Sequence, residues 1–370
     1  MLKQRLRLPQ QENMEMVTGG IKGIHKDISP IIRPLGLLSV SKNMKRFGVT
    51  GAETRQDRIS LGSLGGIGIS ALSAYYKSAD NSKYLISGTG ESLYKYNGTS
   101  WDIIKTELTP GKFFNAASLN DIHILTNGVD NVLKYTGGLT ASDLGGSPPK
   151  SPFVTTAYQR VFLVQLPSSL RISDIAAPEI YTGGDSASIP INDRDGDEVK
   201  WVQLYKTNVV VWKRYSIHEI HGPEAGRLTS DWRVFNIAKV GTVNGRTIAD
   251  VNGVLYWLSD SANAKGIVRW SGGRPVLISG PVQQILDSIN YEHIDKACAT
   301  TDGDGSYMLS IPTGLSSEPD TTIVFDTKDE TWWVWVDWSP TSFASYRLDN
   351  KELVVMGDSN GQVYAMLGDD

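Results

Sequence analysis

The side chains best suited to chemistry in this sequence form an acidic cluster, Asp193-Arg-Asp-Gly-Asp-Glu198. Alternating carboxylates beside a glycine are typical of calcium loops, because Ca²⁺ takes its ligands from oxygen atoms. Asp193, Asp195 and Asp197 are therefore the candidate metal ligands. The twelve-residue frame and the distal bidentate glutamate of a complete calcium loop are missing. We expect a solvated acidic turn with no cofactor, and calcium is the alternative.

A second pair of possible metal ligands lies in His218-Glu-Ile-His221. The surrounding residues predict a β-strand, on which positions 218 and 221 point to opposite faces, so the two imidazoles cannot share one ion. Catalytic motifs are missing as well: the sequence has no G-x-S-x-G, no P-loop and no H-E-x-x-H. No pair of carboxylates can be assigned to glycoside hydrolysis. We therefore predict that the protein is not an enzyme.

Short hairpins must position these residues. A unit in which a small polar turn precedes a hydrophobic strand recurs seven times, as in Asp250-Val-Asn-Gly-Val-Leu-Tyr-Trp-Leu258. The units start near residues 79, 118, 158, 204, 250, 302 and 348, which are 39 to 52 residues apart. A repeat of about 40–50 residues built from hairpins is typical of a β-propeller with four strands per blade. The sequence predicts an all-β fold, a β-propeller of about seven (six to eight) four-stranded blades.

The predicted propeller spans residues 58–370. Its last repeat offers only three strands, Phe343–Leu348, Glu352–Met356 and Gln362–Leu367. Arg58–Gly62 precedes the first full repeat and could supply the missing fourth strand, since pairing the two ends of the chain removes an exposed sheet edge. The strongest helical segment is Pro281–Ile289, with apolar residues at the spacing of one helix face.

The densest group of aromatic residues is Thr331-Trp-Trp-Val-Trp-Val-Asp-Trp338. Alternation along a strand places Trp333, Trp335 and Asp337 on one face. The other face then takes Trp332, Val334, Val336 and Trp338. Large aromatic side chains in a propeller fill the spaces between blades, so we expect this segment to pack in the core.

Residues 1–57 differ from the repeats, and we interpret them as an extended N-terminal arm that docks on a partner. They carry many basic residues and three prolines, and they show little alternation. The segment Ile28–Leu38 is too hydrophobic for a solvated linker, although a loosely attached leader is the alternative. The candidate docking residues are Ile28, Ile31, Ile32, Arg33, Leu35, Leu37 and Leu38.

Composition restricts the remaining classes of function. The 370 residues include 36 basic and 40 acidic side chains, for a net charge of −4, which disfavours a protein that binds duplex DNA by neutralising its phosphates. The charge is compatible with a channel wall past which DNA slides.

The single cysteine, Cys298, cannot form an internal disulfide. No segment approaches 18 consecutive apolar residues, so we expect no membrane segment and a protein made in a reducing cytosol.

Several short motifs follow one another in a particular order. They are Lys45–Gly48, Leu93-Tyr-Lys-Tyr-Asn-Gly98, Ile124–Tyr135, Arg171–Asp174, Gly196–Lys200, Val211-Trp-Lys-Arg-Tyr-Ser-Ile217 and Gly253–Ser259. Their order resembles a family of bacteriophage virion proteins, whose members combine an extended N-terminal segment with repeated LY-x-Y-x-G hairpins and a K-R-x-S-I strand. The resemblance covers roughly residues 40–280, and it rests on the order of the motifs.

The resemblance implies a β-propeller component of a phage tail, a nozzle or hub subunit such as the nozzle of short-tailed phages. Nozzle subunits form hexameric rings below the portal and adaptor, through which DNA exits, and the family implies no catalytic residues. The implied partners are further copies in a homo-hexamer, the adaptor, portal and fibre proteins, and passing DNA. The implied location is the virion tail, after assembly in the host bacterial cytoplasm. The short C-terminus leaves no room for the large domains inserted in some nozzle proteins.

The alternative function is a receptor- or carbohydrate-binding propeller of the tail. In that case exposed tryptophans such as Trp101, Trp232 and Trp270 would stack on sugar rings. A propeller hydrolase is a third hypothesis, for which the sequence offers no nucleophile and no acid–base pair.

Overall fold

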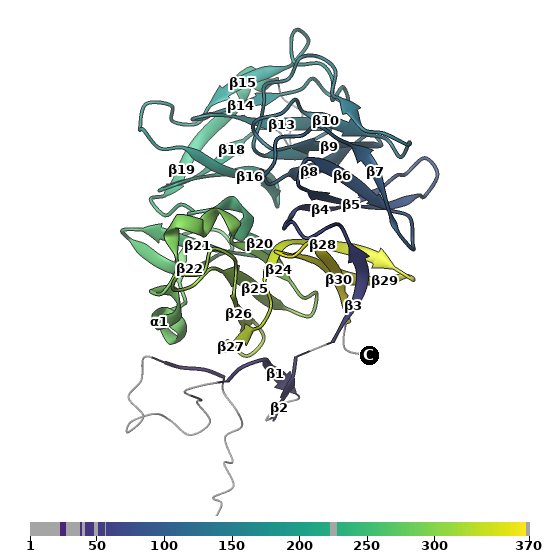
Figure 1. Cartoon of the computed structure of the whole chain (residues 1–370). Helices are drawn as coiled ribbons and strands as arrows, with labels where there is room; N and C mark the ends of the chain where they lie inside the picture. The colour runs from purple at the N-terminus through teal and green to yellow at the C-terminus, as the bar shows by residue number, and fades with distance from the viewer. Residues whose placement is uncertain are drawn as a thin grey trace, which may run out of the picture.

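Seven β-sheets, each of four antiparallel strands, surround a common centre and form a β-propeller (Figure 1). The computed structural model describes residues 23–26, 38, 41–47, 51–55, 57–222 and 228–367, and the sheets are counted over these residues. The expected all-β fold and the number of four-stranded blades are confirmed. A separate hairpin, β1 (Met44–Phe47) with β2 (Gly51–Thr54), lies outside the ring beyond β27.

The strands of a blade follow one another in the chain, and the first strand of each blade lies nearest the centre. Blade 1 consists of β4 (Ile69–Tyr76), β5 (Lys83–Thr89), β6 (Ser92–Tyr96) and β7 (Trp101–Lys105). Blade 2 consists of β8 (Asn115–Leu119), β9 (Ile122–Thr126), β10 (Leu133–Tyr135) and β11 (Ser142–Asp143). Blade 3 consists of β12 (Val154–Ala157), β13 (Arg160–Gln165), β14 (Ser169–Ile172) and β15 (Ala187–Pro190). Blade 4 consists of β16 (Val199–Tyr205), β17 (Asn208–Lys213), β18 (Ile217–His221) and β19 (Arg233–Ala238). Blade 5 consists of β20 (Ala249–Val251), β21 (Val254–Ser261), β22 (Ala264–Trp270) and β23 (Val276–Leu277). Blade 6 consists of β24 (Cys298–Thr301), β25 (Ser306–Ile311), β26 (Thr321–Asp326) and β27 (Thr331–Val336). Blade 7 contains β28 (Pro340–Leu348), β29 (Lys351–Asp358), β30 (Gln362–Met366) and β3 (Arg58–Ser63).

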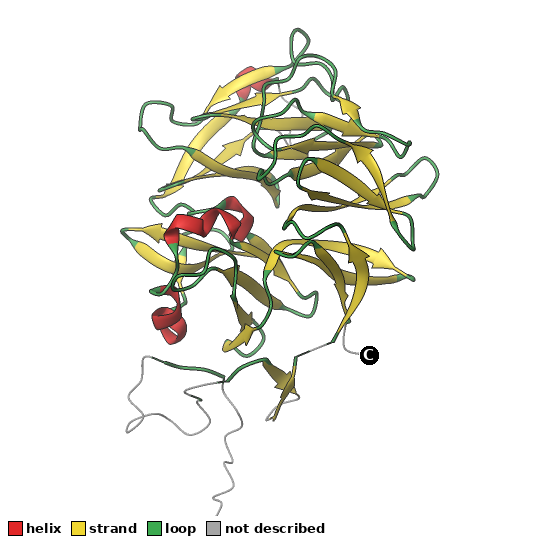
Figure 2. Ribbon diagram, viewed as in Figure 1, coloured by secondary structure: helices red, strands yellow, loops and turns green. Residues whose placement is uncertain are grey.

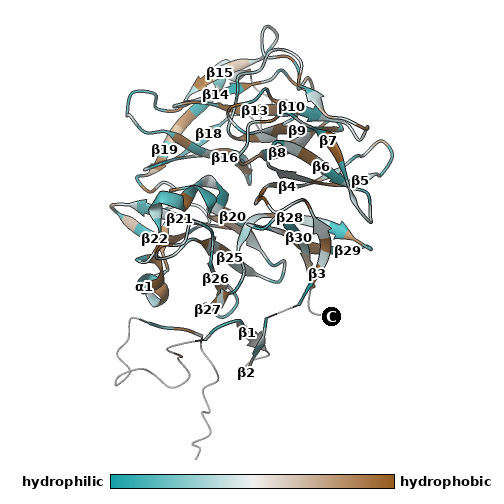
Figure 3. Cartoon of the chain, in the orientation of Figure 1, coloured by the Kyte–Doolittle hydropathy of each residue, from teal (hydrophilic) through white to brown (hydrophobic). Residues whose placement is uncertain are grey.

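The hydrophobic core consists of seven clusters, each between two neighbouring blades. The second strand of a blade is buried on both faces, so consecutive apolar residues serve two different clusters. On β17, Val209 and Val211 pack toward blade 3, whereas Val210 and Trp212 pack toward blade 5. This explains the uninterrupted apolar runs in the sequence, and Figure 3 shows the hydrophobic colour along the strands of the blades.

The repeated unit found in the sequence is the hairpin between the first and second strands of a blade. Its turns require left-handed backbone, which glycine and asparagine adopt most readily. Asn252 and Gly253 have φ of 53° and 79° between β20 and β21, and Asp349 and Asn350 have φ of 46° and 64° between β28 and β29. The regular spacing therefore marks the innermost hairpin of every blade.

The ring closes in blade 7, where β3 from the N-terminal side pairs with β30 from the C-terminal side. The register joins Arg58 to Met366 and Ser63 to Gln362, and the side chain of Leu61 is buried in the cluster between blades 7 and 1. This is the pairing expected from the three-stranded last repeat. It gives blade 7 its fourth strand.

Helical structure is limited to short turns in the described residues (Figure 2). They are α1 (Gln283–Leu286) and the 3₁₀ turns η2 (Thr229–Asp231), η3 (Gly245–Thr247), η4 (Gly280–Val282) and η5 (Tyr291–Lys296). The helix expected over Pro281–Ile289 is shorter than its sequence pattern: α1 ends at Leu286, and Ile289 forms a bridge with Thr313. The predicted apolar face is buried nevertheless. None of these helices is long and apolar enough to cross a bilayer.

The tryptophan-rich segment is buried, as expected, in β27. Trp332 faces the cluster between blades 5 and 6, and Trp333 and Trp335 face the one between blades 6 and 7. The expected position of Trp338 is wrong, since it packs with Trp333 and Trp335. The strand ends at Val336, and Asp337 has a φ of 65°, which reverses the alternation after that point.

Between blades 1 and 2, His123 is 2% exposed and stacks on Tyr75 with ring centroids 5.2 Å apart. Its ring nitrogens lie 3.0 Å from the hydroxyl of Ser73 and 2.8 Å from that of Ser118. Burial lowers the pKa of His123 to about 3. The histidine is therefore neutral in the folded protein at neutral pH.

This histidine makes folding sensitive to acid. The unfolded histidine has a pKa of about 6.5, so below that pH the unfolded chain binds a proton that the folded chain does not. Stability is expected to be complete above pH 6.5 and to fall as the pH drops toward 3, with a loss of about 3 kcal/mol at pH 4 from this group. Urea unfolding of the wild type and His123→Gln at pH 7 and pH 4 measures it. An equal acid loss in both proteins would contradict the assignment.

Candidate functional site

The outer edge of blade 6 differs from the edges of other blades. The outermost strands β11, β19 and β23 are largely exposed, whereas β27 is buried along nearly its whole length. The difference arises because residues 23–26 and 41–47 lie against β27. An uncovered edge strand presents a row of unpaired backbone groups, and this segment covers part of that row.

Backbone hydrogen bonds hold the N-terminal segment on this edge. The amide of Ile24 donates to the carbonyl of Trp332 (2.8 Å), and the amide of Asn43 donates to the carbonyl of Val334 (2.9 Å). Lys42 forms a parallel bridge with Val334. The indole of Trp335 donates to the carbonyl of Met44 at 2.7 Å. The segment thus adds a partial fifth strand to blade 6.

Side chains fix the position of the segment. Ile24 is 2% exposed and belongs to the core between blades 5 and 6. Gly23 has a φ of 79°, and a Cβ atom there would lie 2.7 Å from the carbonyl oxygen of Trp332, so only glycine fits this approach. The guanidinium of Arg55 lies 4.1 Å from the ring centre of Trp338. Burial and the adjacent Arg58 lower the pKa of Arg55 to about 10, and Asp337 opposes this shift.

Most of the docking residues expected from the sequence lie outside the described residues. These are Ile28, Ile31, Ile32, Arg33, Leu35 and Leu37. Leu38 is described, and it packs on the cluster between blades 6 and 7 of its own chain. Its amide donates to the carbonyl of Gly23 (2.9 Å), and its carbonyl accepts from the amide of His25 (3.0 Å). Leu38 therefore helps to anchor the segment to the propeller, and its contact with a partner stays a prediction.

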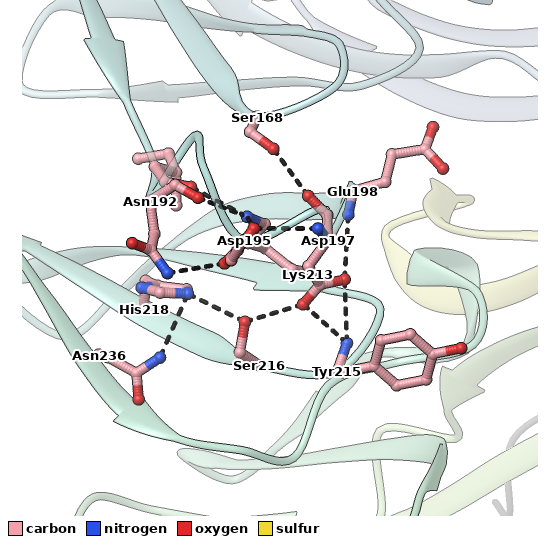
Figure 4. A network of polar contacts seen from close by, with 11 residues as sticks. Ser168, Asn192, Asp195, Asp197, Glu198, Lys213, Tyr215, Ser216, His218 and Asn236 are labelled. Carbon is pink, nitrogen blue, oxygen red and sulfur yellow. Dashed lines mark hydrogen bonds and ion pairs between the residues drawn. The ribbon is translucent and has the colours of Figure 1, made fainter.

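The acidic cluster lies in the loop between β15 and β16, where Lys213 reaches it from β17 (Figure 4). The side chain of Lys213 is fully buried. Its ammonium lies 2.5 Å from the Asp195 carboxylate, 3.1 Å from the carbonyl of Ile191 and 3.2 Å from that of Asn192. Burial alone would raise the pKa of Asp195, but the hydrogen bond from Lys213 and that from the amide of Asp197 lower it below its ordinary value.

Asp197 holds the neighbouring turn. Its carboxylate accepts hydrogen bonds from the amide of Tyr215 (3.1 Å) and the hydroxyl of Ser216 (3.0 Å), and its carbonyl accepts from Ser168 (2.7 Å) (Figure 4). Ser216 lies 3.0 Å from a ring nitrogen of His218. The oxygens that the sequence offered to a cation are thus directed at a lysine and at backbone amides.

The metal candidates therefore occupy different surroundings. Asp195 pairs with a lysine, Asp197 is a buried hydrogen-bond acceptor and Asp193 is exposed. Within the described part of the chain, no group of three or more His, Cys, Asp or Glu side chains is arranged to hold a metal. His218 is buried and His221 is exposed on β18, which confirms that they face opposite sides. The expectation that the protein takes no cofactor stays a prediction.

Two of the three tryptophans expected to bind carbohydrate are buried. Trp232 is 6% exposed and Trp270 is 2% exposed. Trp101 is half-buried, and its indole donates to the carbonyl of Leu61 in β3 (2.9 Å). These rings instead pack within and between blades, as large aromatic groups in a propeller do.

A cavity of about 220 Å³ lies at the centre of the propeller and receives residues from all seven blades and the segments that lead into them. Most of its lining residues are apolar or aromatic, but polar atoms make up about half of the exposed wall. Five half-buried rings contribute to them: Phe113, Phe114, Phe153, Trp201 and Phe343. The only basic side chain among the lining residues is Arg246, from the turn η3 that leads into blade 5.

Arg246 is held firmly in the cavity wall. Its amide donates to the side chain of Asn244, which caps the turn (3.0 Å). Gly245 cannot carry a side chain, because a Cβ atom would lie 2.2 Å from the carbonyl oxygen of Lys200. The guanidinium donates to the carbonyls of Asp295 and Thr341, and its carbon lies 3.7 Å from the ring centre of Phe113.

Sequence analysis did not identify Lys213 or Arg246. The adjacent motif Asn244-Gly-Arg246 could have indicated a tight turn that presents an arginine. Nothing in the sequence places that turn at the centre of the ring, because its contacts come from blades 4 and 7 and from the segments that precede blades 2 and 6. Lys213 ends a hydrophobic strand pattern, and nothing in that pattern indicates that its side chain is buried.

Comparison with known proteins identifies the fold alone. No protein-family model matches the chain, and no curated protein matches it in sequence. One similar solved structure is the extracellular domain of a protein described as a hybrid two-component system, BT4673 from B. thetaiotaomicron. The TM-score is 0.56 and the sequence identity is 11%. The match covers 85% of this chain and 40% of that chain. YCF48 bound to D1 peptide (TM-score 0.50, 10% identity, 86% of this chain and 96% of that one) is also similar. So is the Neurospora crassa Pan2 WD40 domain (TM-score 0.50, 9% identity, 85% and 96%).

Proposed function

We propose that the protein is a non-catalytic structural subunit of a bacteriophage tail, of the nozzle or hub type, which joins neighbouring tail proteins around a DNA-exit channel. The observation that carries the proposal is the outer edge of blade 6, where an N-terminal segment adds to β27 through backbone hydrogen bonds. Strand addition is a recurring way to join proteins, since backbone bonds provide affinity and side-chain pockets provide specificity. The order of motifs that resembles phage virion proteins agrees with this role.

The proposed partner contact is the stretch between two anchored points. Ile24 and Leu38 form a parallel bridge, so the ends of the stretch 27–37 are held together at the rim of blade 6. The apolar residues Ile31 and Ile32 belong to this stretch. In the proposal they contact the next subunit of a homo-hexamer. In the proposal, DNA passes through the space that the ring of subunits encloses and not through the centre of a single propeller, because aromatic side chains line that centre.

Two titratable groups of the core, Cys298 and His123, have pKa values that do not suit catalysis near neutral pH. Burial raises the pKa of the Cys298 thiol to about 12, although Arg246 opposes the shift. A thiol with this pKa is protonated at neutral pH and is a poor nucleophile. The low pKa of His123 likewise leaves it unable to serve as a base that becomes protonated near pH 7.

Electron microscopy and light scattering of the purified full-length chain test the proposal. We expect hexameric rings for the wild type, and a monomer for the double variant Ile31→Asp, Ile32→Asp with a thermal unfolding midpoint unchanged to within about 2 °C. The matched control is Leu315→Asp, which changes a fully exposed leucine on another part of the propeller and should leave the rings intact. A wild type that stays monomeric at tens of micromolar and is missing from virions by immunogold labelling overturns the proposal.

A further inference from the structure

The strongest unexplained feature of the propeller is the half-buried positive charge of Arg246, which has no described negative partner. The guanidinium of Arg246 donates to two backbone carbonyls and lies 3.3 Å from the hydroxyl of Ser342, and all three acceptors are neutral. No described carboxylate forms an ion pair with it; Asp295 contributes its carbonyl oxygen. Burial lowers the pKa of Arg246, with Cys298 and Asp295 opposing the shift. A partly desolvated charge of this kind is stabilised by an anion at contact distance.

The surroundings indicate what kind of anion fits. Phe113 covers one face of the guanidinium, and Phe153 and Trp201 pack together with ring centres 5.3 Å apart on another part of the wall. These rings are half-buried, so they keep apolar surface that a ligand could cover. A cavity of about 220 Å³ is smaller than the 300–1,000 Å³ of drug-sized sites, so it suits a ligand with one ring or one side chain.

We propose that the central cavity is a binding site for an apolar carboxylate, with the carboxylate on Arg246 and the apolar group among Phe113, Phe153 and Trp201. Arginine suits this role because its planar donors match the two oxygens of a carboxylate. The rigid turn of Asn244 and Gly245 positions the guanidinium before any ligand arrives, which reduces the entropy lost on binding. The ligand is a free small acid or the C-terminal carboxylate of a polypeptide whose last residue is apolar. The inference is independent of the proposed role in a phage tail.

Isothermal titration calorimetry of the full-length protein with 3-phenylpropionate tests this proposal. We expect saturable binding, at least about tenfold weaker binding of the neutral 3-phenylpropionamide, and at least about a tenfold loss in Arg246→Gln. The control Arg274→Gln removes the same charge from an exposed position and should bind as the wild type does. Equal affinity for acid and amide, or undiminished binding by Arg246→Gln, overturns the proposal.

A second variant covers the case in which Arg246→Gln fails to fold. Ala299→Leu keeps the arginine and fills part of the cavity, so it should abolish binding while the circular dichroism spectrum is unchanged. The peptide Gly-Gly-Phe, with a free or an amidated C-terminus, distinguishes the two sources. Tighter binding of the free-ended peptide than of 3-phenylpropionate assigns the site to a polypeptide end, and weaker binding assigns it to a small acid. No binding of any probe up to about 10 mM contradicts the site.

Discussion

A chain that begins at Gly65, and therefore lacks β3, is expected to lose on the order of 5 kcal/mol of unfolding free energy. Its removal breaks the backbone pairing from Arg58 to Ser63 along β30 and exposes the core contacts of Leu61. It also leaves the indole of Trp101 without its acceptor, the carbonyl of Leu61. Urea unfolding followed by tryptophan fluorescence measures the loss, and we expect a tendency to aggregate through the open edge of β30.

The matched control is a chain that begins at Asp57, because it also lacks the segment on β27 but keeps every residue of β3. We expect it to be more stable than the chain that begins at Gly65 by most of the predicted loss. A synthetic peptide spanning residues 57–64 should restore part of the stability of the chain that lacks β3, because it supplies the same edge strand in trans. Equal stability of the two truncated chains would show that closure through β3 contributes nothing.

The substitution Lys213→Met is expected to cost about 4 kcal/mol, the second largest effect. The ammonium is fully buried, and its loss removes the counter-charge of Asp195 and leaves the carbonyls of Ile191 and Asn192 without this donor. The methionine side chain fills much of the same volume, so the loss reports on charge and hydrogen bonds rather than on a cavity. Chemical denaturation at pH 7 measures it.

Two further variants separate the charge pair from its surroundings. Lys200→Met removes a lysine whose partner Glu198 is 43% exposed, and it should cost less than about 1 kcal/mol. Asp195→Asn in the Lys213→Met background should recover part of the loss, since it removes the unpaired charge. The lowered pKa of Asp195 means that the stability from this pair is present above the unfolded pKa and is lost as the pH falls through the folded value. A Lys213→Met protein as stable as Lys200→Met would contradict this account.

The architecture was predictable because its signals are local. Each innermost hairpin needs a turn such as Asn252-Gly253, and each second strand needs a continuous apolar run such as Val209–Trp212, so both appear in the sequence at a regular interval. The closing strand was predictable from the count of strands in the last repeat. The face on which the Trp338 side chain lies was not predictable, because one residue with left-handed backbone, Asp337, reverses the alternation of the strand.

The candidate sites depended on contacts between distant parts of the chain. Asp195 and Lys213 are 18 residues apart, and Arg246 donates to Ser342, 96 residues away. A charged residue inside a strand pattern looks the same in sequence whether it faces solvent or a buried loop. The alternation rule did succeed for His218 and His221, because it requires only that the strand be regular between them.

Because the ring closes by pairing the two ends of the propeller, a chain with a different starting point could form the same fold. The amide of Leu367 donates to the carbonyl of Asp57 at 3.0 Å, so the last strand ends beside the residue that precedes β3. A short link from Leu367 to Asp57 would make β30 and β3 an ordinary hairpin, and the chain could then begin in the exposed turn at Gly65 and Gly66. Such a circular permutant would have seven blades of consecutive strands, and the N-terminal segment on β27 could be added or left out without opening the ring.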